Sequence, residues 1–224
     1  MKTAMILAAG RGERLRPLTD TLPKPLIPLA GKPLIIHLIE RLARNGIKHI
    51  VINIAYRREQ IKNALGDGKS LGVQIDYSEE TEALETAGGI IHALPLLGNQ
   101  PFLAISADIW TDYPFATLFQ RQKNLGHLIL VPNPAWHPTG DFSLDARGEL
   151  LNKPQWTYAN IGLFHPDFFK DYLPGWRRLR DLFSRGIALH QLTGEVYHGS
   201  WFNISDEATL REAEQFLAVS PPKH

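Results

Sequence analysis

The chain has 224 residues, a length that fits one domain and allows roughly 70% of the unfolded surface to be buried. Its formal net charge is +1, with acidic and basic residues interspersed, which argues against nucleic acid or an anionic membrane as the main partner. Cysteine is absent, which excludes disulfides and thiolate chemistry, and without a signal-peptide layout or an apolar run of about 20 residues we expect a soluble cytoplasmic protein.

The first predicted strand, residues 4–7, leads directly into a loop that combines small residues with cations. Four small residues let the backbone approach a ligand there: Ala8, Ala9, Gly10 and Gly12. Three arginines supply positive charge for a polyanionic ligand: Arg11, Arg14 and Arg16. Arg14 occupies the third glycine position of a dinucleotide fingerprint, and no Gly-Lys-Ser/Thr follows as in a Walker loop, so both of these phosphate loops are excluded.

Lys24 follows this loop and stands between two prolines, which fix φ and favour an extended backbone. Its ammonium therefore has a defined direction as a point charge for phosphate. Each feature alone has a structural explanation, because glycine turns, solvated arginines and stiff Pro-Lys-Pro loops are common. Their combination within residues 5–25 favours a site for a nucleoside triphosphate.

Strand and helix signals alternate through residues 31–106, which is typical of a mostly parallel sheet covered by helices. A helix is expected from Pro33, because an apolar stripe follows it and Asn45-Gly46 is a stop signal. The stripe consists of Leu34, Ile35, Leu38, Ile39 and Leu42. Further strands are predicted at 49–54, 73–77 and 101–106, and further helices at 57–65 and 86–97.

The second half predicts a small mixed sheet, because short strands are separated by Pro- and Gly-rich turns. Strands are expected at 127–131, 141–144 and 158–164, with a hairpin or edge strand at 195–202. Helices are expected at 166–173, 176–184 and 206–217, the last with Ser205 as its N-cap. We expect a single domain over residues 1–218 and a disordered tail at 219–224.

The first loop resembles the signature of the sugar-1-phosphate nucleotidyltransferases in the run Leu7-Ala8-Ala9-Gly10-x-Gly12-x-Arg14-Leu15-x-Pro17-Leu18-Thr19, followed by Pro23-Lys24-Pro25-Leu26. Enzymes of this family condense a sugar 1-phosphate with a nucleoside triphosphate and release pyrophosphate. The resemblance implies an α/β fold, a Rossmann-like three-layer sandwich with a mostly parallel central sheet and a small mixed-sheet sugar-binding part. Residues 1–112 would form the nucleotide-binding half and residues 113–218 the sugar-binding half.

The resemblance also implies which residues bind each substrate. The nucleotide-binding set is Ala8, Ala9, Gly10, Gly12, Glu13, Arg14, Lys24, Thr86 and Gly88. The sugar-binding set is Ser106, Gly140, Asp141, Lys153 and Asn160. Lys153 is equally consistent with a turn lysine, and Asn160 with an ordinary strand end.

Asp108 follows the strand that ends near Ser106. Open α/β sheets bind ligands outside the carboxyl ends of their strands, so this carboxylate is placed to bind Mg²⁺. A helix or turn cap is the alternative, and the irregular loop expected at 110–112 favours the metal. The position resembles the first metal-binding aspartate of the family.

The family's second metal-binding aspartate is replaced by Asn203, and Ser205 replaces a glycine. An amide oxygen can ligate Mg²⁺ but lacks the carboxylate's charge, so weaker binding is expected. Either the triphosphate oxygens provide most of the metal ligands, or the chain is a nucleotide-binding regulatory protein with little turnover.

In the expected reaction, the sugar-phosphate oxygen attacks the α-phosphorus of UTP in line, and pyrophosphate leaves. The catalytic residues would be Arg14 at the β- and γ-phosphates, Lys24 at the α-phosphate, and Asp108. Mg²⁺ on Asp108 would bridge the α-phosphate and the sugar phosphate.

Shorter segments indicate the sugar and the base. Residues 84–89, with Glu85, and residues 140–142 most resemble the N-acetylmuramate-1-phosphate uridylyltransferases of cell-wall recycling. The expected substrates are therefore UTP and N-acetylmuramate 1-phosphate. Mannose- or heptose-1-phosphate guanylyltransferases and glucose-1-phosphate thymidylyltransferases are the alternatives, and both a monomer and a homodimer stay open.

Overall fold

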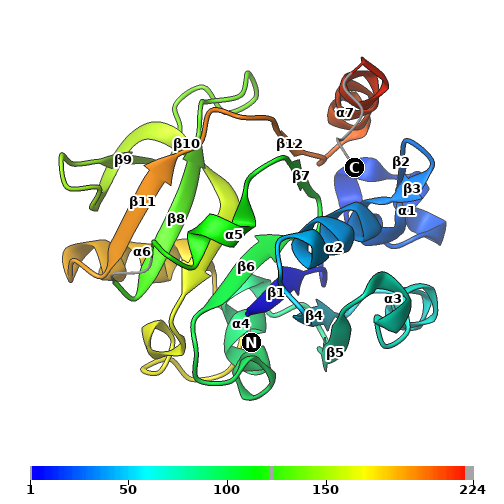
Figure 1. Ribbon diagram of the computed structural model, residues 1–224, viewed down its shortest axis with the longest axis horizontal. Coiled ribbons are helices and arrows are strands. Elements are labelled where there is room, and N and C mark those ends of the chain that lie inside the picture. The colour runs from blue at the N-terminus through cyan, green and yellow to red at the C-terminus, as the bar shows by residue number, and fades with distance from the viewer. Residues whose placement is uncertain (1, 122–123, 220–224) are drawn as a thin grey trace.

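A sheet of eight strands runs through the computed structural model, which describes residues 2–121 and 124–219 (Figure 1). The strands are β1 Thr3–Leu7, β4 His49–Ile54, β5 Gln74–Glu79, β6 Phe102–Ser106, β8 Gly126–Val131, β9 Phe142–Leu144, β10 Leu150–Phe164 and β11 Leu192–Val196. Their order is β11-β8-β10-β6-β1-β4-β5, and β9 pairs with β10. Two antiparallel pairs lie outside this sheet: β2 Pro28–Leu29 with β3 Lys32–Pro33, and β7 Ile109–Thr111 with β12 Trp201–Asn203.

The strands β6, β1, β4 and β5 are parallel to one another. Three of them, β1, β4 and β6, are almost entirely buried, as their apolar runs predict. In the register, Leu7 lies opposite both Asn53 and Ser106. The carboxyl ends of three strands therefore meet at one edge, which is where open α/β sheets bind ligands.

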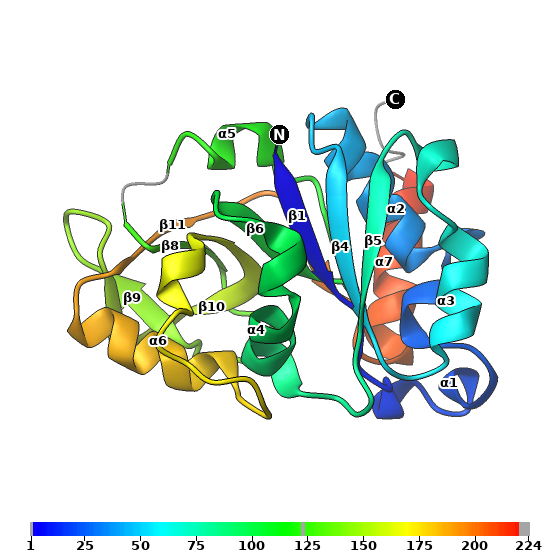
Figure 2. The same cartoon turned by 90° about the horizontal axis from the view of Figure 1, so that it is seen from below.

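Helices cover both faces of the sheet, which confirms the predicted three-layer α/β sandwich (Figure 2). One face carries α2 Leu34–Arg44 and α3 Arg58–Leu65, and the other carries α4 Glu85–Leu97 and α6 Leu179–Ala188. The predicted apolar stripe of α2 is buried along its whole length. The last helix, α7 Glu207–Val219, packs with the first loop in a separate apolar cluster that includes Leu15, Trp110 and Leu210. The shorter helical elements are α1 Leu18–Thr21, α5 Phe115–Leu118 and the 3-10 turns Glu13–Leu15, Lys24–Leu26, Lys69–Leu71 and Pro166–Phe168.

The helices predicted at 166–173 and 176–184 are wrong in their bounds. The first is reduced to the 3-10 turn Pro166–Phe168, and α6 begins only at Leu179. The segment before α6 stays out of the helix because Arg177 hydrogen bonds to the start of α4. Its N–H donates to the Leu84 carbonyl (3.0 Å), and its own carbonyl accepts from the Ala87 N–H (3.0 Å). A contact between distant parts of the sequence thus overrides the local helix signal.

The irregular loop predicted at 110–112 differs from the structure, and the edge strand predicted near 195–202 is present but lies earlier in the sequence, as β11. Residues 109–111 form β7, which pairs with β12, whereas β11 lies beside β8 at the edge of the main sheet. Three residues are too few for a strand period to be recognised, so β7 had no local signal. Strand β10 begins at Leu150, earlier than predicted, and its register shifts between Tyr158 and Gly162, where Asn160 has a φ of +56°.

The N-cap of α7 is Asp206 rather than the predicted Ser205. The helix begins at Glu207, and the Asp206 Oδ1 accepts a hydrogen bond from the Thr209 N–H at 2.9 Å. The helix continues to Val219, and the rest of the predicted tail lies outside the described residues. Strands from both predicted halves of the chain form one continuous sheet. The division into a nucleotide-binding and a sugar-binding half at residue 112 therefore stays a prediction.

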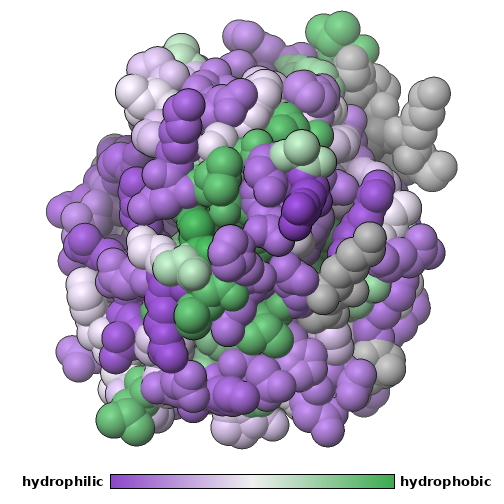
Figure 3. Space-filling model, turned by 90° about the vertical axis from the view of Figure 1, so that its left-hand side faces the viewer, coloured by the Kyte–Doolittle hydropathy of each residue, from purple (hydrophilic) through white to green (hydrophobic). Residues whose placement is uncertain are grey.

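The surface on the side of β9, β11 and α6 is largely hydrophilic, with apolar residues gathered in a band near its middle (Figure 3). Helix α6 buries Leu179, Leu182 and Phe183 toward the core and leaves Arg180 and Asp181 exposed. Across residues 2–121 and 124–219, none of the helices is long and apolar enough to cross a membrane.

Candidate active site

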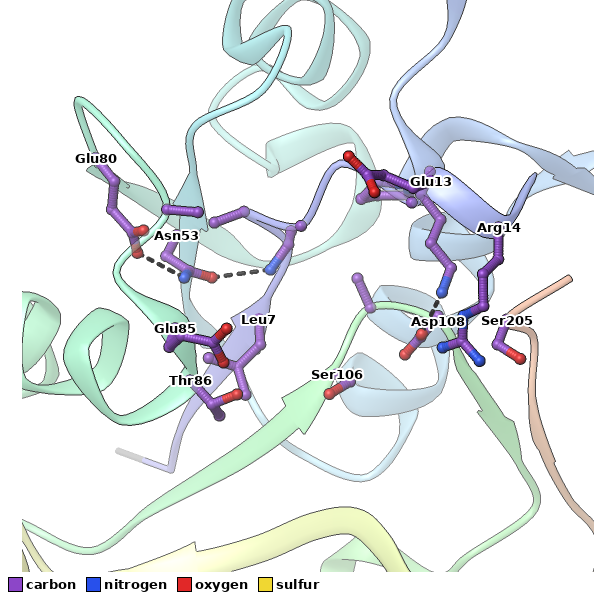
Figure 4. Close-up of a pocket in the computed structure, with 18 residues that line it drawn as sticks. Leu7, Glu13, Arg14, Asn53, Glu80, Glu85, Thr86, Ser106, Asp108 and Ser205 are labelled. Atoms are coloured by element: carbon purple, nitrogen blue, oxygen red, sulfur yellow. Dashed lines mark hydrogen bonds and ion pairs between the residues drawn. The ribbon is translucent and has the colours of Figure 1, made fainter. Parts of the chain in front are cut away.

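A cavity lies at the carboxyl edge of the parallel strands and adjoins a second one, and Glu85 and Thr86 line both of them. The first cavity, about 480 Å³, is bordered by the ends of β1 and β6, the loop after β1 and the start of α4 (Figure 4). Its lining includes every predicted nucleotide-binding residue except Gly88: Ala8, Ala9, Gly10, Gly12, Glu13, Arg14, Lys24 and Thr86. Ser106 and Asp108 line the same cavity.

Gly12 brings Lys24 close to the first loop. Its φ of +72° is a conformation that residues with a side chain rarely adopt. A Cβ at Gly12 would lie only 2.8 Å from the Cβ of Lys24, and the Gly12 carbonyl accepts a hydrogen bond from the Thr19 hydroxyl at 2.9 Å. A glycine is therefore required here for the loop and Lys24 to share one wall of the cavity.

Lys24 and Asp108 form an ion pair at the floor of the first cavity (Figure 4). Their side chains are only 14% and 21% exposed, so the interaction is weakly screened by water. The structure thus joins two of the three predicted catalytic residues, one from the Pro-Lys-Pro segment and one from the end of β6.

The three arginines of the first loop have different roles. Arg14 lines the cavity and points toward Asp108 and Ser205 (Figure 4). Arg11 lies over the Tyr56 ring, 5.5 Å from its centroid, and Arg16 pairs with Asp20 at 2.7 Å on the surface. Of the three arginines that were predicted to face a polyanionic ligand, only Arg14 lines the cavity.

A buried network behind the loop was missed by sequence analysis. The Asn53 Oδ1 accepts from the Ala8 N–H (2.8 Å), and the Asn53 Nδ2 donates to the Glu80 Oε1 (2.7 Å). The other Glu80 oxygen accepts from the Leu84 N–H at 3.0 Å. Gly89 leaves room for this network, since a Cβ there would lie 2.6 Å from the Asn53 Nδ2. The available signals were one polar residue in an apolar strand and one acid in an acidic run.

Gly88 does not line the first cavity, contrary to the nucleotide-binding prediction for it. Its N–H donates to the Arg177 carbonyl at 3.1 Å, and a Cβ would collide with the Gly175 carbonyl. The glycine at this position allows close packing of α4 against residues 175–177. The backbone segment that faces the cavity at this helix start is instead Glu85-Thr86.

The second cavity, about 360 Å³, lies between β10, the segment before β9 and the start of α6. Asp141 is its central acid: the carboxylate accepts from the Tyr158 N–H (2.9 Å) and lies 3.2 Å from the His137 Nε2 and 3.7 Å from the Arg180 guanidinium. Asn160 and Asn203 line the same cavity, and so does Trp136, whose side chain is half exposed.

The other predicted sugar-binding residues lie elsewhere. Ser106 faces the first cavity, and Lys153 is an exposed residue of β10 that lines neither cavity. Gly140 is buried with a φ of +71°, and a Cβ there would lie 2.8 Å from the Trp156 backbone nitrogen. Its glycine is explained by this close backbone contact, which orients the neighbouring Asp141.

Asp108 and Asn203 are brought together by the β7–β12 pair. Asn203 lies opposite Ile109, and the Ile204 N–H donates to the Asp108 carbonyl at 2.9 Å. The Asn203 Oδ1 is buried and has no hydrogen-bond donor among the described residues. Asp108 lines the first cavity and Asn203 the second, so the link between them that the structure shows is through the backbone. Carboxylate and amide oxygens are the kind of ligand that Mg²⁺ takes, with phosphate and water completing its shell. Among residues 2–121 and 124–219 there is no group of three acidic, histidine or cysteine side chains that would hold a metal by itself.

The positive charge of Arg14 also influences Asp206, the residue before α7. The pKa of Asp206 is lowered chiefly by the hydrogen bond from the Thr209 N–H, and the positive charge of Arg14 contributes further. The carboxylate of Asp206 therefore stays ionised beside the cavity. Its role is to cap α7, which supports the helix against the first loop.

The fold and this arrangement define a nucleotidyltransferase. The model of the Nucleotidyl transferase family matches residues 3–141, and the chain belongs to this family of enzymes. The family expected from the first loop is thereby confirmed.

Among individual proteins, the chain is similar to the N-acetylmuramate alpha-1-phosphate uridylyltransferase of Neisseria meningitidis serogroup B, with 44% identity over 94% of this chain and 96% of the relative. It is 33% identical to the enzyme of the same name from Caulobacter vibrioides, over 97% of both chains. The mannose-1-phosphate guanylyltransferase catalytic subunit beta of Drosophila melanogaster is 40% identical, but over 55% of this chain and 34% of its own.

Solved structures share the fold. A proposed glucose-1-phosphate thymidylyltransferase from Bacillus anthracis, in complex with a sucrose, has a TM-score of 0.86 at 23% identity over 100% of this chain and 96% of its own. HddC from Yersinia pseudotuberculosis, complexed with GMP-PN, has a TM-score of 0.81 at 18% identity over 96% and 99%.

Proposed function

We propose that this enzyme transfers the uridylyl group of UTP to N-acetylmuramate 1-phosphate, giving UDP-N-acetylmuramate and pyrophosphate, as a cytoplasmic step of cell-wall recycling. The observation that carries the proposal is the pair of adjoining cavities: one has Arg14 and Lys24 for phosphates, and the other has the polar side chains of Asp141 and Asn160 for a sugar. The choice of base and sugar is supported by near-full-length similarity to two uridylyltransferases.

The proposed reaction requires the two substrates to be aligned, and it does not require a side chain to activate the attacking oxygen. An oxygen of the sugar phosphate forms a bond to the α-phosphorus of UTP, while the bond from that phosphorus to the bridging oxygen of the β-phosphate breaks and pyrophosphate leaves. The attacking phosphate is already anionic at neutral pH, so no side chain has to remove a proton. Catalysis then consists of alignment and charge neutralisation in a protected site.

Lys24 and Arg14 provide this neutralisation in the proposal. The Lys24 ammonium exchanges Asp108 for an oxygen of the α-phosphate, and the Arg14 guanidinium binds the departing pyrophosphate. A magnesium ion held by Asp108 and Asn203 would supply additional positive charge at the phosphate oxygens.

The variant Lys24→Ala tests the catalytic role. Removing one charge contact from such a site raises the barrier by on the order of 3 kcal/mol, so turnover should fall by roughly a hundredfold or more. Pyrophosphate release with UTP and N-acetylmuramate 1-phosphate measures this. Lys69→Ala is the matched control, since that lysine is 87% exposed and pairs with the surface residue Asp67. Near-normal turnover by Lys24→Ala would contradict the assignment.

The substrates are tested by a matrix of sugar 1-phosphates and nucleotides. It pairs the 1-phosphates of N-acetylmuramate, N-acetylglucosamine, mannose, heptose and glucose with UTP, GTP and dTTP. We expect the highest kcat/KM for N-acetylmuramate 1-phosphate with UTP. A higher value for mannose or heptose with GTP, or for glucose with dTTP, would favour one of the alternative enzymes and overturn the proposed specificity.

A regulatory protein with little turnover is the second candidate, and it is motivated by Asn203. Because its Oδ1 has no donor among the described residues, Asn203→Asp should add charge to the proposed ion site and lower the Mg²⁺ concentration for half-maximal activity. The same variant without Mg²⁺ should unfold at a lower temperature, because it buries an uncompensated carboxylate. Tight UTP binding by the wild type without pyrophosphate release, together with turnover in Asn203→Asp, would support the regulatory candidate.

A further inference from the structure

We propose that Arg178 recognises a carboxylate on the sugar substrate, and that it thereby selects N-acetylmuramate 1-phosphate over neutral sugar phosphates. This inference rests on the proposed function and assigns a residue to its sugar selectivity. Arg178 is the residue immediately before α6 and lines the second cavity together with Asp141 and Asn160.

The charges within the second cavity leave Arg178 available. Two acids line this cavity: Asp141 already has His137 at 3.2 Å and Arg180 at 3.7 Å, and Glu85 forms no ion pair with Arg178. Among residues 2–121 and 124–219, the Arg178 guanidinium has no ion pair and no hydrogen bond. A guanidinium presents planar, paired donors that match a carboxylate. The second cavity therefore offers a cation that its own acids do not occupy.

Aromatic side chains position this cation and the ring of the substrate. The Arg178 guanidinium lies over the Trp176 ring, 5.2 Å from its centroid, which limits the orientations that the long side chain adopts. Trp136 lines the same cavity with 51% of its surface exposed, and it stacks on His137 at a centroid distance of 5.9 Å. An exposed indole in a polar cavity is suited to covering the apolar face of a sugar ring.

The chemistry of the substrate explains why the sugar cavity needs a cation of its own. N-acetylmuramate differs from N-acetylglucosamine by a lactyl ether on O3, which adds a carboxylate at a ring position other than C1, where the phosphate is attached. The phosphates have Arg14 and Lys24 in the first cavity, whereas Arg178 lies in the second. A neutral sugar would leave Arg178 without a charged partner, and a lactyl carboxylate would provide one.

The test compares the 1-phosphates of N-acetylmuramate and N-acetylglucosamine, each with UTP, in the wild type and in Arg178→Met. Methionine keeps much of the length and removes the charge. Loss of a charge-assisted hydrogen bond should lower kcat/KM for N-acetylmuramate 1-phosphate by roughly 10- to 100-fold, mainly through KM. The value for N-acetylglucosamine 1-phosphate should change by less than about twofold, since that sugar has no carboxylate to lose. Arg178→Lys should recover part of the selectivity.

Arg185→Met is the matched control on the same helix. Arg185 pairs with Asp171 at 3.1 Å and lies outside the lining of the second cavity, so its removal should leave both substrates unchanged. Thermal unfolding and UTP binding of Arg178→Met should match the wild type, because Arg178 is exposed.

The outcomes separate this inference from the proposed function. If the wild type uses N-acetylmuramate 1-phosphate and Arg178→Met keeps the same preference, only the role of Arg178 is overturned. Equal loss for both sugars would assign Arg178 to general binding and would also overturn it. If the wild type does not use N-acetylmuramate 1-phosphate at all, the proposed function and the inference both fail.

Discussion

Glu85 carries backbone strain where the two cavities meet. It is the first residue of α4, and its φ of +63° places a residue with a side chain in the left-handed region. Its carboxylate side chain lines both cavities, and Figure 4 shows it directed into the first one. Strain of this kind persists where surrounding structure or function requires the residue.

The variant Glu85→Gly should therefore stabilise the fold and weaken the enzyme. Relief of the left-handed conformation should raise the free energy of unfolding by about 1 kcal/mol, while kcat/KM falls because the carboxylate is lost. Urea denaturation and pyrophosphate release measure the two effects. Glu85→Ala is the control, since it removes the carboxylate but keeps the strain. Equal stability of the glycine and alanine variants would contradict the strain argument.

At the scale of elements, Glu80 joins three segments of the first cavity. Through Asn53 it connects β4 to the loop after β1, and through the Leu84 N–H it holds the start of α4. Glu80 is only 2% exposed, so water cannot replace these hydrogen bonds. The position of the nucleotide-binding loop thus depends on a carboxylate that does not have to touch the nucleotide.

Removal of that carboxylate should affect stability and binding together. Glu80→Ala leaves the Asn53 Nδ2 and the Leu84 N–H unsatisfied, and we expect the free energy of unfolding to fall by about 2–3 kcal/mol. The KM for UTP should rise, because the Ala8 segment loses its support. Glu79→Ala is the control, because its solvent-exposed ion pair with Lys62 should contribute little to stability. Similar losses in both variants would argue against the network.

At the scale of the whole molecule, acid should weaken the fold through Glu195 of β11. His127, whose Nε2 lies 3.9 Å from the Glu195 Oε2, is the main cause that lowers the pKa of Glu195 to about 2, and the Tyr113 hydroxyl, which donates to Oε1 at 2.6 Å, adds to it. Arg121 lies 3.3 Å from the same carboxylate. These contacts connect the edge strand of the sheet to its neighbour β8 and to the segment after β7.

The sign of the pH dependence follows from this lowered pKa. Between about pH 4.5 and 2 the unfolded chain binds a proton at Glu195 that the folded chain does not, so stability rises with pH. The contribution is complete above pH 4.5 and is lost as the pH falls toward 2. Urea denaturation between pH 3 and 7 should show a smaller decrease in acid for Glu195→Gln than for the wild type. Identical slopes would contradict a folded-state interaction at Glu195.

Features formed by residues close together in the sequence were predicted, and features that depend on contacts between distant segments were not. Lys24 and Gly12 belong to one continuous motif, and the motif alone indicated a phosphate site. The burial of α2 also followed from its own apolar stripe. Asn53 and Glu80 could not be recognised, because their roles appear only when β1, β4 and the start of α4 come together in the register of the sheet.

The errors have the same physical origin. Residues 176–178 were predicted to be helical, but tertiary hydrogen bonds of Arg177 keep them out of α6. Strand β7 exists because β12 pairs with it, and that partner lies far along the chain. Gly88, predicted to bind nucleotide, lies outside the lining of the first cavity, and a Cβ there would lie 2.3 Å from the Gly175 carbonyl oxygen. The first loop is one continuous segment and could be recognised in the sequence. The second cavity is formed by segments that are distant in the sequence, so it could not be predicted before the fold was known.

The ion pair between Lys24 and Asp108 has a consequence for how the two ligands of the first cavity would influence each other. The carboxylate that would hold a cation also holds the lysine that would bind phosphate. A cation that occupies Asp108 would release Lys24 for the nucleotide, and a nucleotide that takes Lys24 would release Asp108 for the cation. Since thermodynamic coupling is reciprocal, each ligand would then raise the affinity for the other by the same factor. The enzyme would take up nucleotide and ion as one cooperative unit, and neither would remain bound for long without the other.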